Sequence, residues 1–204
     1  MSKLVLTAPL AGWATSLDEV PDAAFAGRML GEGLAIDPTG SELRAPCDGE
    51  VSVVAAQKHA VTIRTDEGAE ILLHVGIDTV QLNGEGFETH VQAGQRVRRG
   101  DLLLRFDLDL LAQRAASVIT PVVILGERFT VARLACDREV APGDFLMELA
   151  PAAQAEQSSG AISGAEIRAE ITIPFEHGLH ARPAAALAAS LKPFSADVRI
   201  QIGA

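Results

Sequence analysis

Two histidines of this chain lie in segments whose residue types suit them to carrying a phosphoryl group. His74 lies in the apolar run 71–77, and His180 is followed two residues later by Arg182. A neutral imidazole is a competent nucleophile toward phosphorus, and a guanidinium offers a planar fork of donors to phosphoryl oxygens. These residue types predict phosphoryl chemistry at both positions and suggest that one group passes between them.

A third histidine, His59, is expected to lie beside His74. A turn near residues 67–68 separates the two, and a hairpin of that length brings both rings to one face of paired strands. Strand alternation places Leu72 on the same face as His74. A second imidazole N–H can bond the phosphoryl oxygens, and surrounding leucines exclude water. Taken alone, the pair is also compatible with two unrelated histidines.

Metal chemistry is the main alternative for these residues. The spacing of His74 and Asp78 also occurs in β-barrel zinc peptidases, but such enzymes need a separate His-x-His, which this chain lacks. Cys47 and Cys136 are far apart and form no CxxC pair, so neither a zinc knuckle, a redox centre nor a disulfide is expected. The sequence therefore predicts neither a resident metal nor a cofactor.

The setting of His180 is a helix start. Free backbone N–H groups and the positive end of the helix dipole make such a position an anion site, and Arg182 reaches the same anion. Gly178 lets the backbone turn into the helix. The ordinary alternative is a histidine that caps the helix beside a surface arginine.

Short strands separated by tight turns must position His59 and His74. Apolar or alternating runs predict strands over 51–54, 61–64, 71–75, 101–106 and 121–125, and glycine-containing turns punctuate them. One short helical segment is predicted over 108–116. This pattern predicts that residues 1–150 form an all-β domain, an antiparallel sandwich or barrel with little helix.

Two further regions follow that domain. Residues 151–165 consist of small and polar residues that cannot bury enough surface to order themselves, which predicts a flexible linker. Residues 166–204 then predict a strand, a helix over 181–191 and a second strand. Such a β-α-β piece is too small for a stable core of its own, so it is interpreted as a truncated part of an α+β domain.

The charge and hydropathy of the chain disfavour several classes of binding partner and a membrane span. Residues 1–150 carry a net charge of −9 out of −10 for the whole chain, which disfavours nucleic acid and anionic membrane surfaces and attracts exposed arginines. No apolar run approaches the roughly 18 residues of a membrane span, and the start lacks a signal-peptide pattern. A cytoplasmic protein is expected.

Residues 6–149 closely resemble the glucose-type enzyme IIA domain of the bacterial phosphoenolpyruvate-dependent sugar phosphotransferase system. The matching stretches, in order along the chain, are 8–12, 20–26, 31–40, 45–49, 74–87, 94–97 and 120–123. The resemblance implies that His74 carries the phosphoryl group and that His59 supports it. The family commonly has a threonine two residues before the supporting histidine, where this chain has Gln57. The resemblance also implies that partners are recognised by Asp22, Phe25, Leu72 and Asp78.

The segment Gly-Leu-His-Ala-Arg-Pro-Ala (178–184) resembles the active-site motif of HPr, the phosphocarrier of the same system. This implies that His180 accepts the phosphoryl group, that Arg182 stabilises it, and that His74 receives it next. The implied partners are an HPr domain of the same or another chain, enzyme I, and a sugar-specific IIB/IIC permease, the only link to a membrane.

A fusion of these parts resembles the front of a multiphosphoryl transfer protein. A second interpretation is a regulatory module whose docking is switched by phosphorylation of His74. In a complex of that kind, His59, His74 and a partner carboxylate could share a zinc ion.

Overall fold

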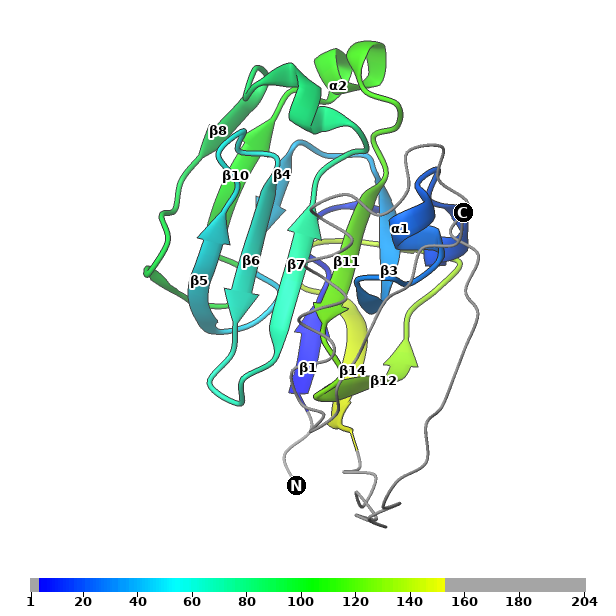
Figure 1. Cartoon of the computed structure of the whole chain (residues 1–204), viewed down its shortest axis with the longest axis vertical. Helices are drawn as coiled ribbons and strands as arrows, with labels where there is room; N and C mark the ends of the chain where they lie inside the picture. The colour runs from blue at the N-terminus through cyan, green and yellow to red at the C-terminus, as the bar shows by residue number, and fades with distance from the viewer. Residues whose placement is uncertain (1–3, 153–204) are drawn as a thin grey trace, which may run out of the picture. The chain divides into compact units, whose positions relative to one another are not determined.

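The structure is a computed structural model that describes residues 4–152 (Figure 1). Its strands are β1 (Leu4–Thr7), β2 (Gly12–Thr15), β3 (Gly31–Pro38), β4 (Glu42–Arg44), β5 (Gly49–Val54), β6 (Ala60–Arg64), β7 (Glu70–His74), β8 (Phe87–Thr89), β9 (Arg96–Val97), β10 (Leu102–Phe106), β11 (Thr120–Leu125), β12 (Phe129–Leu134), β13 (Arg138–Val140) and β14 (Phe145–Pro151). Its helices are α1 (Ala23–Ala26), α2 (Leu108–Arg114) and the short 3-10 helices η1 (Leu17–Glu19) and η2 (Thr79–Leu82).

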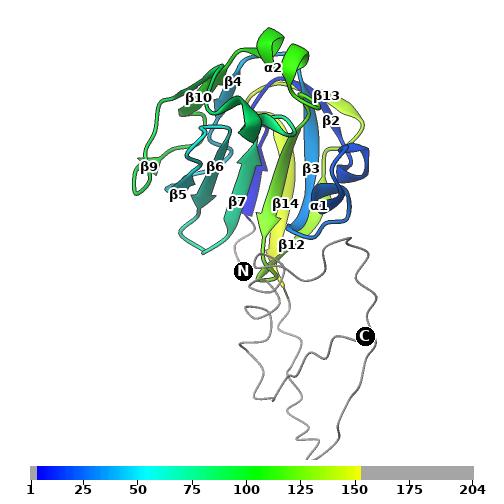
Figure 2. The same ribbon diagram turned by 45° about the horizontal axis from the view of Figure 1, so that its top comes forward.

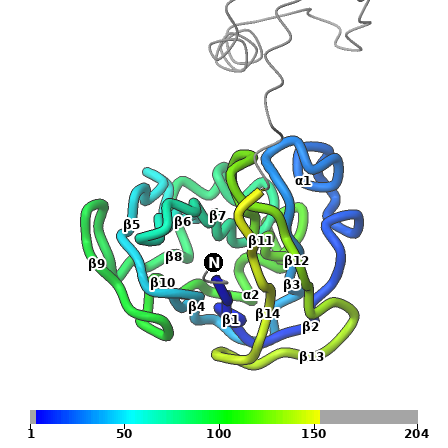
Figure 3. Tube along the Cα trace, turned by 90° about the horizontal axis from the view of Figure 1, so that it is seen from below, coloured from blue at the N-terminus to red at the C-terminus, as the bar shows by residue number. Residues whose placement is uncertain are grey.

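The strands form three sheets, and every pair within them is antiparallel. The largest sheet has the order β13-β2-β3-β11-β7-β6-β5-β9, and the smaller ones are β1-β14-β12 and β4-β10-β8. In Figure 1, β6, β7, β11 and β3 lie side by side, and Figure 3 shows β1 and β14 on the inner side of this curved sheet. The predicted all-β antiparallel sandwich is confirmed.

Two apolar clusters hold the domain together, one on each face of the large sheet. The main core lies between the sheets and includes Leu73 of β7 and Leu104 of β10, both fully buried. A smaller cluster joins Leu17, Phe25 and Val123, and Leu72 packs against it. Strand β7 therefore contributes Leu73 to one cluster and Leu72 to the other, as alternation along a strand requires.

Helix α1 belongs to the second cluster and lies on the outer side of the sheet next to β3 (Figure 2). It begins at Asp22, whose side chain accepts hydrogen bonds from the backbone of Ala24 and Phe25 at 2.8 and 3.2 Å. This cap satisfies donors that a helix start leaves free. Among residues 4–152, no helix is long and apolar enough to cross a membrane.

The predicted linker and the predicted β-α-β piece lie almost wholly outside the described residues 4–152. Pro151 still belongs to β14, where it pairs with Phe129, and the rest of the predicted linker after Ala152 lies outside the described residues. The predicted β-α-β piece at 166–204 also lies outside them.

Candidate functional site

The structure brings His59 and His74 together at the end of a hairpin. His74 is the last residue of β7 and pairs with Ala60, the first residue of β6. The next backbone N–H, that of Val75, donates to the carbonyl of His59 at 2.8 Å. The two rings meet edge to face, with centroids 4.9 Å apart and an interplanar angle of 71°. The expected juxtaposition of the two imidazoles is therefore present.

A backbone carbonyl fixes which nitrogen of His74 is free. Nδ1 of His74 lies 2.8 Å from the carbonyl oxygen of Gly76. A carbonyl only accepts hydrogen bonds, so Nδ1 must carry the proton and Nε2 keeps its lone pair. The ring thus presents Nε2 as its nucleophilic atom.

Gly76 can hold its carbonyl there because it has no side chain. Its φ is +69°, and a Cβ at this position would lie 2.6 Å from Cγ2 of Thr79. Thr79 is itself fully buried, and its hydroxyl donates to the carbonyl of Val75 at 2.8 Å. The turn after His74 is therefore held by the hydrogen bonds of His74 and Thr79 and leaves no space at position 76 for a residue larger than glycine.

Electrostatics keep His74 neutral. Burial, followed by the neighbouring His59, lowers the pKa of His74 from 6.5 to about 4, although the Gly76 carbonyl and the carboxylate of Asp22 act in the opposite direction. Burial penalises the charged ring, and a second imidazole adds repulsion when both are protonated. The ring is therefore uncharged, and able to act as a nucleophile, throughout the neutral pH range.

His59 exposes little surface to solvent, at 8% of its maximum. Burial lowers its pKa, and the backbone of Gln57 partly offsets that effect. Nδ1 of His59 has no hydrogen-bond partner among residues 4–152, so the side chain of Gln57 does not supply the contact expected of the usual threonine.

Phe25 lies against the other side of the His74 ring. The two centroids are 5.3 Å apart, with the rings at 63°. Phe25 is only 6% exposed, so it offers a partner little surface and instead walls the histidine on its α1 side. Asp22, which caps that helix, is half-buried and is the one carboxylate that raises the pKa of His74.

The outer residues around the histidine pair are a mixture of charged and apolar side chains. Asp78 is exposed and adopts a left-handed backbone with φ of 60°, and Leu72 is half-buried under α1. Large exposed apolar side chains follow α1 and the His74 turn in sequence, namely Met29, Leu30 and Val80. The sequence did not single out these three, because isolated apolar residues on a surface are common and give no signal by themselves.

The histidine pair by itself is an incomplete metal site. Among residues 4–152, no group of three or more His, Cys, Asp and Glu side chains is arranged to hold a metal ion. Two imidazoles supply half of a tetrahedral zinc shell, so a zinc ion there would need ligands from another protein. His180 and Arg182 lie outside the described residues.

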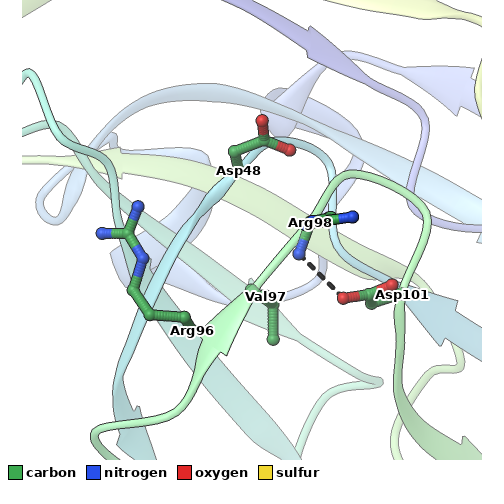
Figure 4. A pocket seen from close by; sticks show the side chains of 5 residues that line it. All are labelled: Asp48, Arg96, Val97, Arg98 and Asp101. Carbon is green, nitrogen blue, oxygen red and sulfur yellow. Dashed lines mark hydrogen bonds between the residues drawn. The ribbon is translucent and has the colours of Figure 1, made fainter.

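A separate polar hollow lies at the edge of the large sheet formed by β9 (Figure 4). Two of its carboxylates already accept hydrogen bonds from backbone N–H groups of the loop that follows β9. Asp101 accepts from the backbone N–H of Arg98 at 2.8 Å, and Asp48 accepts from that of Arg99 at 2.7 Å. Arg96 pairs with Asp66 at 2.6 Å. These contacts bind the carboxylates of the hollow to the protein itself, so they hold the loop in shape.

Comparison with known proteins assigns the domain. Residues 4–153 match the family model of the phosphoenolpyruvate-dependent sugar phosphotransferase system, EIIA 1. The chain belongs to this family. A separate model, the HPr component phosphorylation site of the same system, matches residues 167–204. The EIIA chain is thus a component of a sugar phosphotransferase system, in which it serves as a phosphocarrier in sugar uptake.

Similar proteins agree with this EIIA assignment. The chain is 51% identical over 119 residues to the glucose-specific EIIA components of Bacillus cereus and Bacillus anthracis, a stretch covering 58% of this chain and 72% of each relative. The solved structure of glucose permease IIA from Mycoplasma capricolum is 38% identical. That match has a TM-score of 0.70 and covers 72% of this chain and 96% of the solved one.

Proposed function

We propose that Nε2 of His74 is the atom that carries the phosphoryl group. The observation that supports this most directly is the hydrogen bond from Nδ1 to the Gly76 carbonyl, which leaves Nε2 unprotonated. The lone pair on Nε2 forms the new N–P bond as the bond to the donor nitrogen breaks, and that electron pair returns to the donor ring. Positive charge then develops on the His74 ring, and the Gly76 carbonyl stabilises it through the Nδ1–H.

His59 has a supporting role in this proposal. Its ring lies edge to face with that of His74, and its Nδ1 is buried without a partner. A proton on Nε2 of His59 can be donated to a phosphoryl oxygen, where it stabilises charge during transfer and afterwards. Because both groups are positioned before the donor arrives, little reorganisation is needed when the group is transferred.

The proposed donor is phospho-HPr, and the proposed acceptor is a sugar-specific IIB domain of a IIB/IIC permease. Enzyme I would recharge HPr. The match of residues 167–204 to the HPr phosphorylation site supports His180 as the phosphorylated residue of an HPr-like segment, with Arg182 binding the phosphoryl oxygens. We divide the chain accordingly into an EIIA domain at 1–150, a linker at 151–165 and a partial HPr-like domain at 166–204.

The residues around the pair are proposed to select partners. Asp22 interacts electrostatically with His74, and Asp78 is exposed four residues after it; two such carboxylates suit a donor that bears an arginine next to its own histidine. Half-buried Leu72 is the apolar residue proposed to meet a partner, and Phe25, which offers little surface, is proposed to contribute indirectly by packing against the ring of His74. Glucose is the sugar named for the bacillus relatives, and it is the first sugar to test for this chain.

Labelling with phosphoenolpyruvate, enzyme I and intact HPr tests the proposal. The full chain should acquire an acid-labile group that maps to the peptide containing His74, and His74→Ala should abolish it there. His90→Ala is the matched control, because His90 belongs to the same domain but its Nε2 faces Glu88 at 3.7 Å. Undiminished label on that peptide in the His74→Ala variant would refute the assignment. Stable capture of partners by unphosphorylated protein alone would instead favour the regulatory interpretation.

A further inference from the structure

Helix α1, which carries Phe25, is too short to be stable without help. It comprises four residues, Ala23–Ala26, whereas isolated helices of fewer than about 12 residues are marginal in water. Its start is held by the Asp22 cap described above. The contacts at the C-terminal end of α1 therefore affect how firmly Phe25 is held against the ring of His74.

The end of α1 is a Schellman turn. The backbone N–H of Arg28 donates to the carbonyl of Phe25 at 2.9 Å, and that of Met29 donates to the carbonyl of Ala24 at 2.9 Å. This pair of bonds satisfies carbonyls that a helix end leaves free. Phe25 is thereby held by both its backbone groups, because its N–H donates to the Asp22 carboxylate and its carbonyl accepts from Arg28.

The residue at the left-handed position of this turn is Arg28, with φ of 52°. Glycine is the usual residue there, because any Cβ is disfavoured in that conformation. An arginine kept at such a position sacrifices backbone stability, so its side chain is expected to contribute something that a glycine could not.

That side chain connects three segments. Nη1 and Nη2 of Arg28 donate to Oδ1 and Oδ2 of Asp18 at 2.7 and 3.2 Å, a two-pronged contact to η1. Nε lies 3.4 Å from the carboxylate of Glu32 at the start of β3. The hydrogen bond to Arg28 lowers the pKa of Asp18, and the same contact raises the pKa of Arg28. Such two-pronged pairs fix orientation better than single contacts between exposed charges.

We propose that Arg28 is a positioning residue for His74, acting through Phe25. By tying the end of α1 to η1 and β3, it fixes the helix whose aromatic ring walls the phosphoryl-accepting imidazole. This inference rests on the proposed function of His74, and it adds a residue that touches neither the ring nor any phosphoryl group.

Arg28→Gly separates positioning from folding. Glycine favours the left-handed conformation, so the melting temperature should stay the same or rise, whereas the contact to Asp18 is lost. We expect the rate of phosphoryl transfer from phospho-HPr to His74 to fall about three- to tenfold. We also expect the NMR signals of the His74 ring to shift and its pKa to rise, because a looser Phe25 leaves the ring less buried. Asp18→Asn should reproduce both changes.

Arg28→Lys and Arg96→Lys form a matched pair. Each keeps the charge but breaks a two-pronged contact to an aspartate, and Arg96 contacts Asp66 in this way at 2.6 and 3.0 Å, far from the histidines. Only Arg28→Lys should alter the His74 signals and the transfer rate.

Unchanged His74 signals and rate in Arg28→Gly would overturn the inference, as would equal losses in Arg96→Lys. The ring signals are read without phosphorylation. If the parent protein accepts no label on His74, the proposed function fails while the positioning role is still decided.

Discussion

The rings of His59 and His74 meet edge to face at 4.9 Å, and each ring has a distinct set of partners. Nδ1–H of His74 donates a hydrogen bond to the Gly76 carbonyl, whereas Nδ1 of His59 is buried without a hydrogen-bond partner among residues 4–152. The two imidazole rings thus differ in their hydrogen bonding, and their proposed roles differ accordingly. His74 offers a lone pair at Nε2, and the role proposed for His59 is to donate a hydrogen bond from its own Nε2.

Replacing His59 by alanine should impair the site without removing the phosphorylated atom. A charge-assisted hydrogen bond contributes about 1.5–3 kcal/mol, so transfer to His74 should slow by about 10–100-fold. Rapid-quench labelling with phospho-HPr measures this rate. His59→Gln, which retains an N–H donor, should recover part of the loss. Equal rates in His59→Ala and the parent protein would remove His59 from the mechanism.

The ring of His74 should titrate far below ordinary histidines. Its pKa of about 4 predicts that NMR signals of this ring stay constant from pH 8 down to about 5 and then move. The unfolded chain binds a proton near pH 6.5, whereas the folded ring does not, so stability falls as the pH drops from about 6.5 to 4. The loss from this residue is at most about 3 kcal/mol. A midpoint near 6.5 would contradict the buried, neutral ring.

Gly76→Ala should disrupt both the turn and the hydrogen bond to His74. A Cβ there meets Thr79 at 2.6 Å in a left-handed backbone, so the variant should lose roughly 2–5 kcal/mol of unfolding free energy. Gly94→Ala is the matched control, because Gly94 has φ of +83° and nothing within 4 Å of an added Cβ. It should lose only about 1–2 kcal/mol. Urea denaturation of both variants compares the two losses.

The two cysteines should differ sharply in reactivity. Burial raises the pKa of Cys47 to about 12, and the residue is 1% exposed. Cys136 is half-buried, and burial raises its pKa as well. Because only the thiolate reacts, iodoacetamide should label Cys136 at least about a hundred times faster at pH 8. Peptide mass spectrometry measures both rates, and fast labelling of Cys47 in the folded protein would contradict its burial.

The strands and turns of this domain were accessible from the sequence because their signals are local. Glycine follows a polar residue at Gly68, Gly84 and Gly100, and each adopts a positive φ in the structure. Gly49 also follows a polar residue and matches the same turn signal, but it begins β5 and has no positive φ. It is needed because a Cβ there would lie 2.6 Å from the carbonyl oxygen of Arg64 on the neighbouring strand.

The finer structure of the site could not be read in the same way. The Gly76 carbonyl that selects the tautomer of His74 is a backbone group, and every residue has one, so the residue type gives no signal of its role. Helix α1 lacks the length that marks a helix, and although Gly27 directly follows it, the left-handed position of its closing turn is taken by Arg28. The pairing of His59 with His74 was predictable because it depends only on hairpin length and strand alternation.

The place of β7 within the sheet has a consequence for the kinetics. Residues 70–73 of the strand pair on one side with β6 and on the other with β11, and His74 at its end pairs with Ala60 of β6, so the strand that carries His74 has little freedom to move toward an incoming donor. In the proposed transfer, His74 keeps its position in the sheet, and the donor protein must approach it. For the transfer proposed at His74, we therefore expect the orientation of the donor protein at encounter to affect the transfer rate more than any movement of β7.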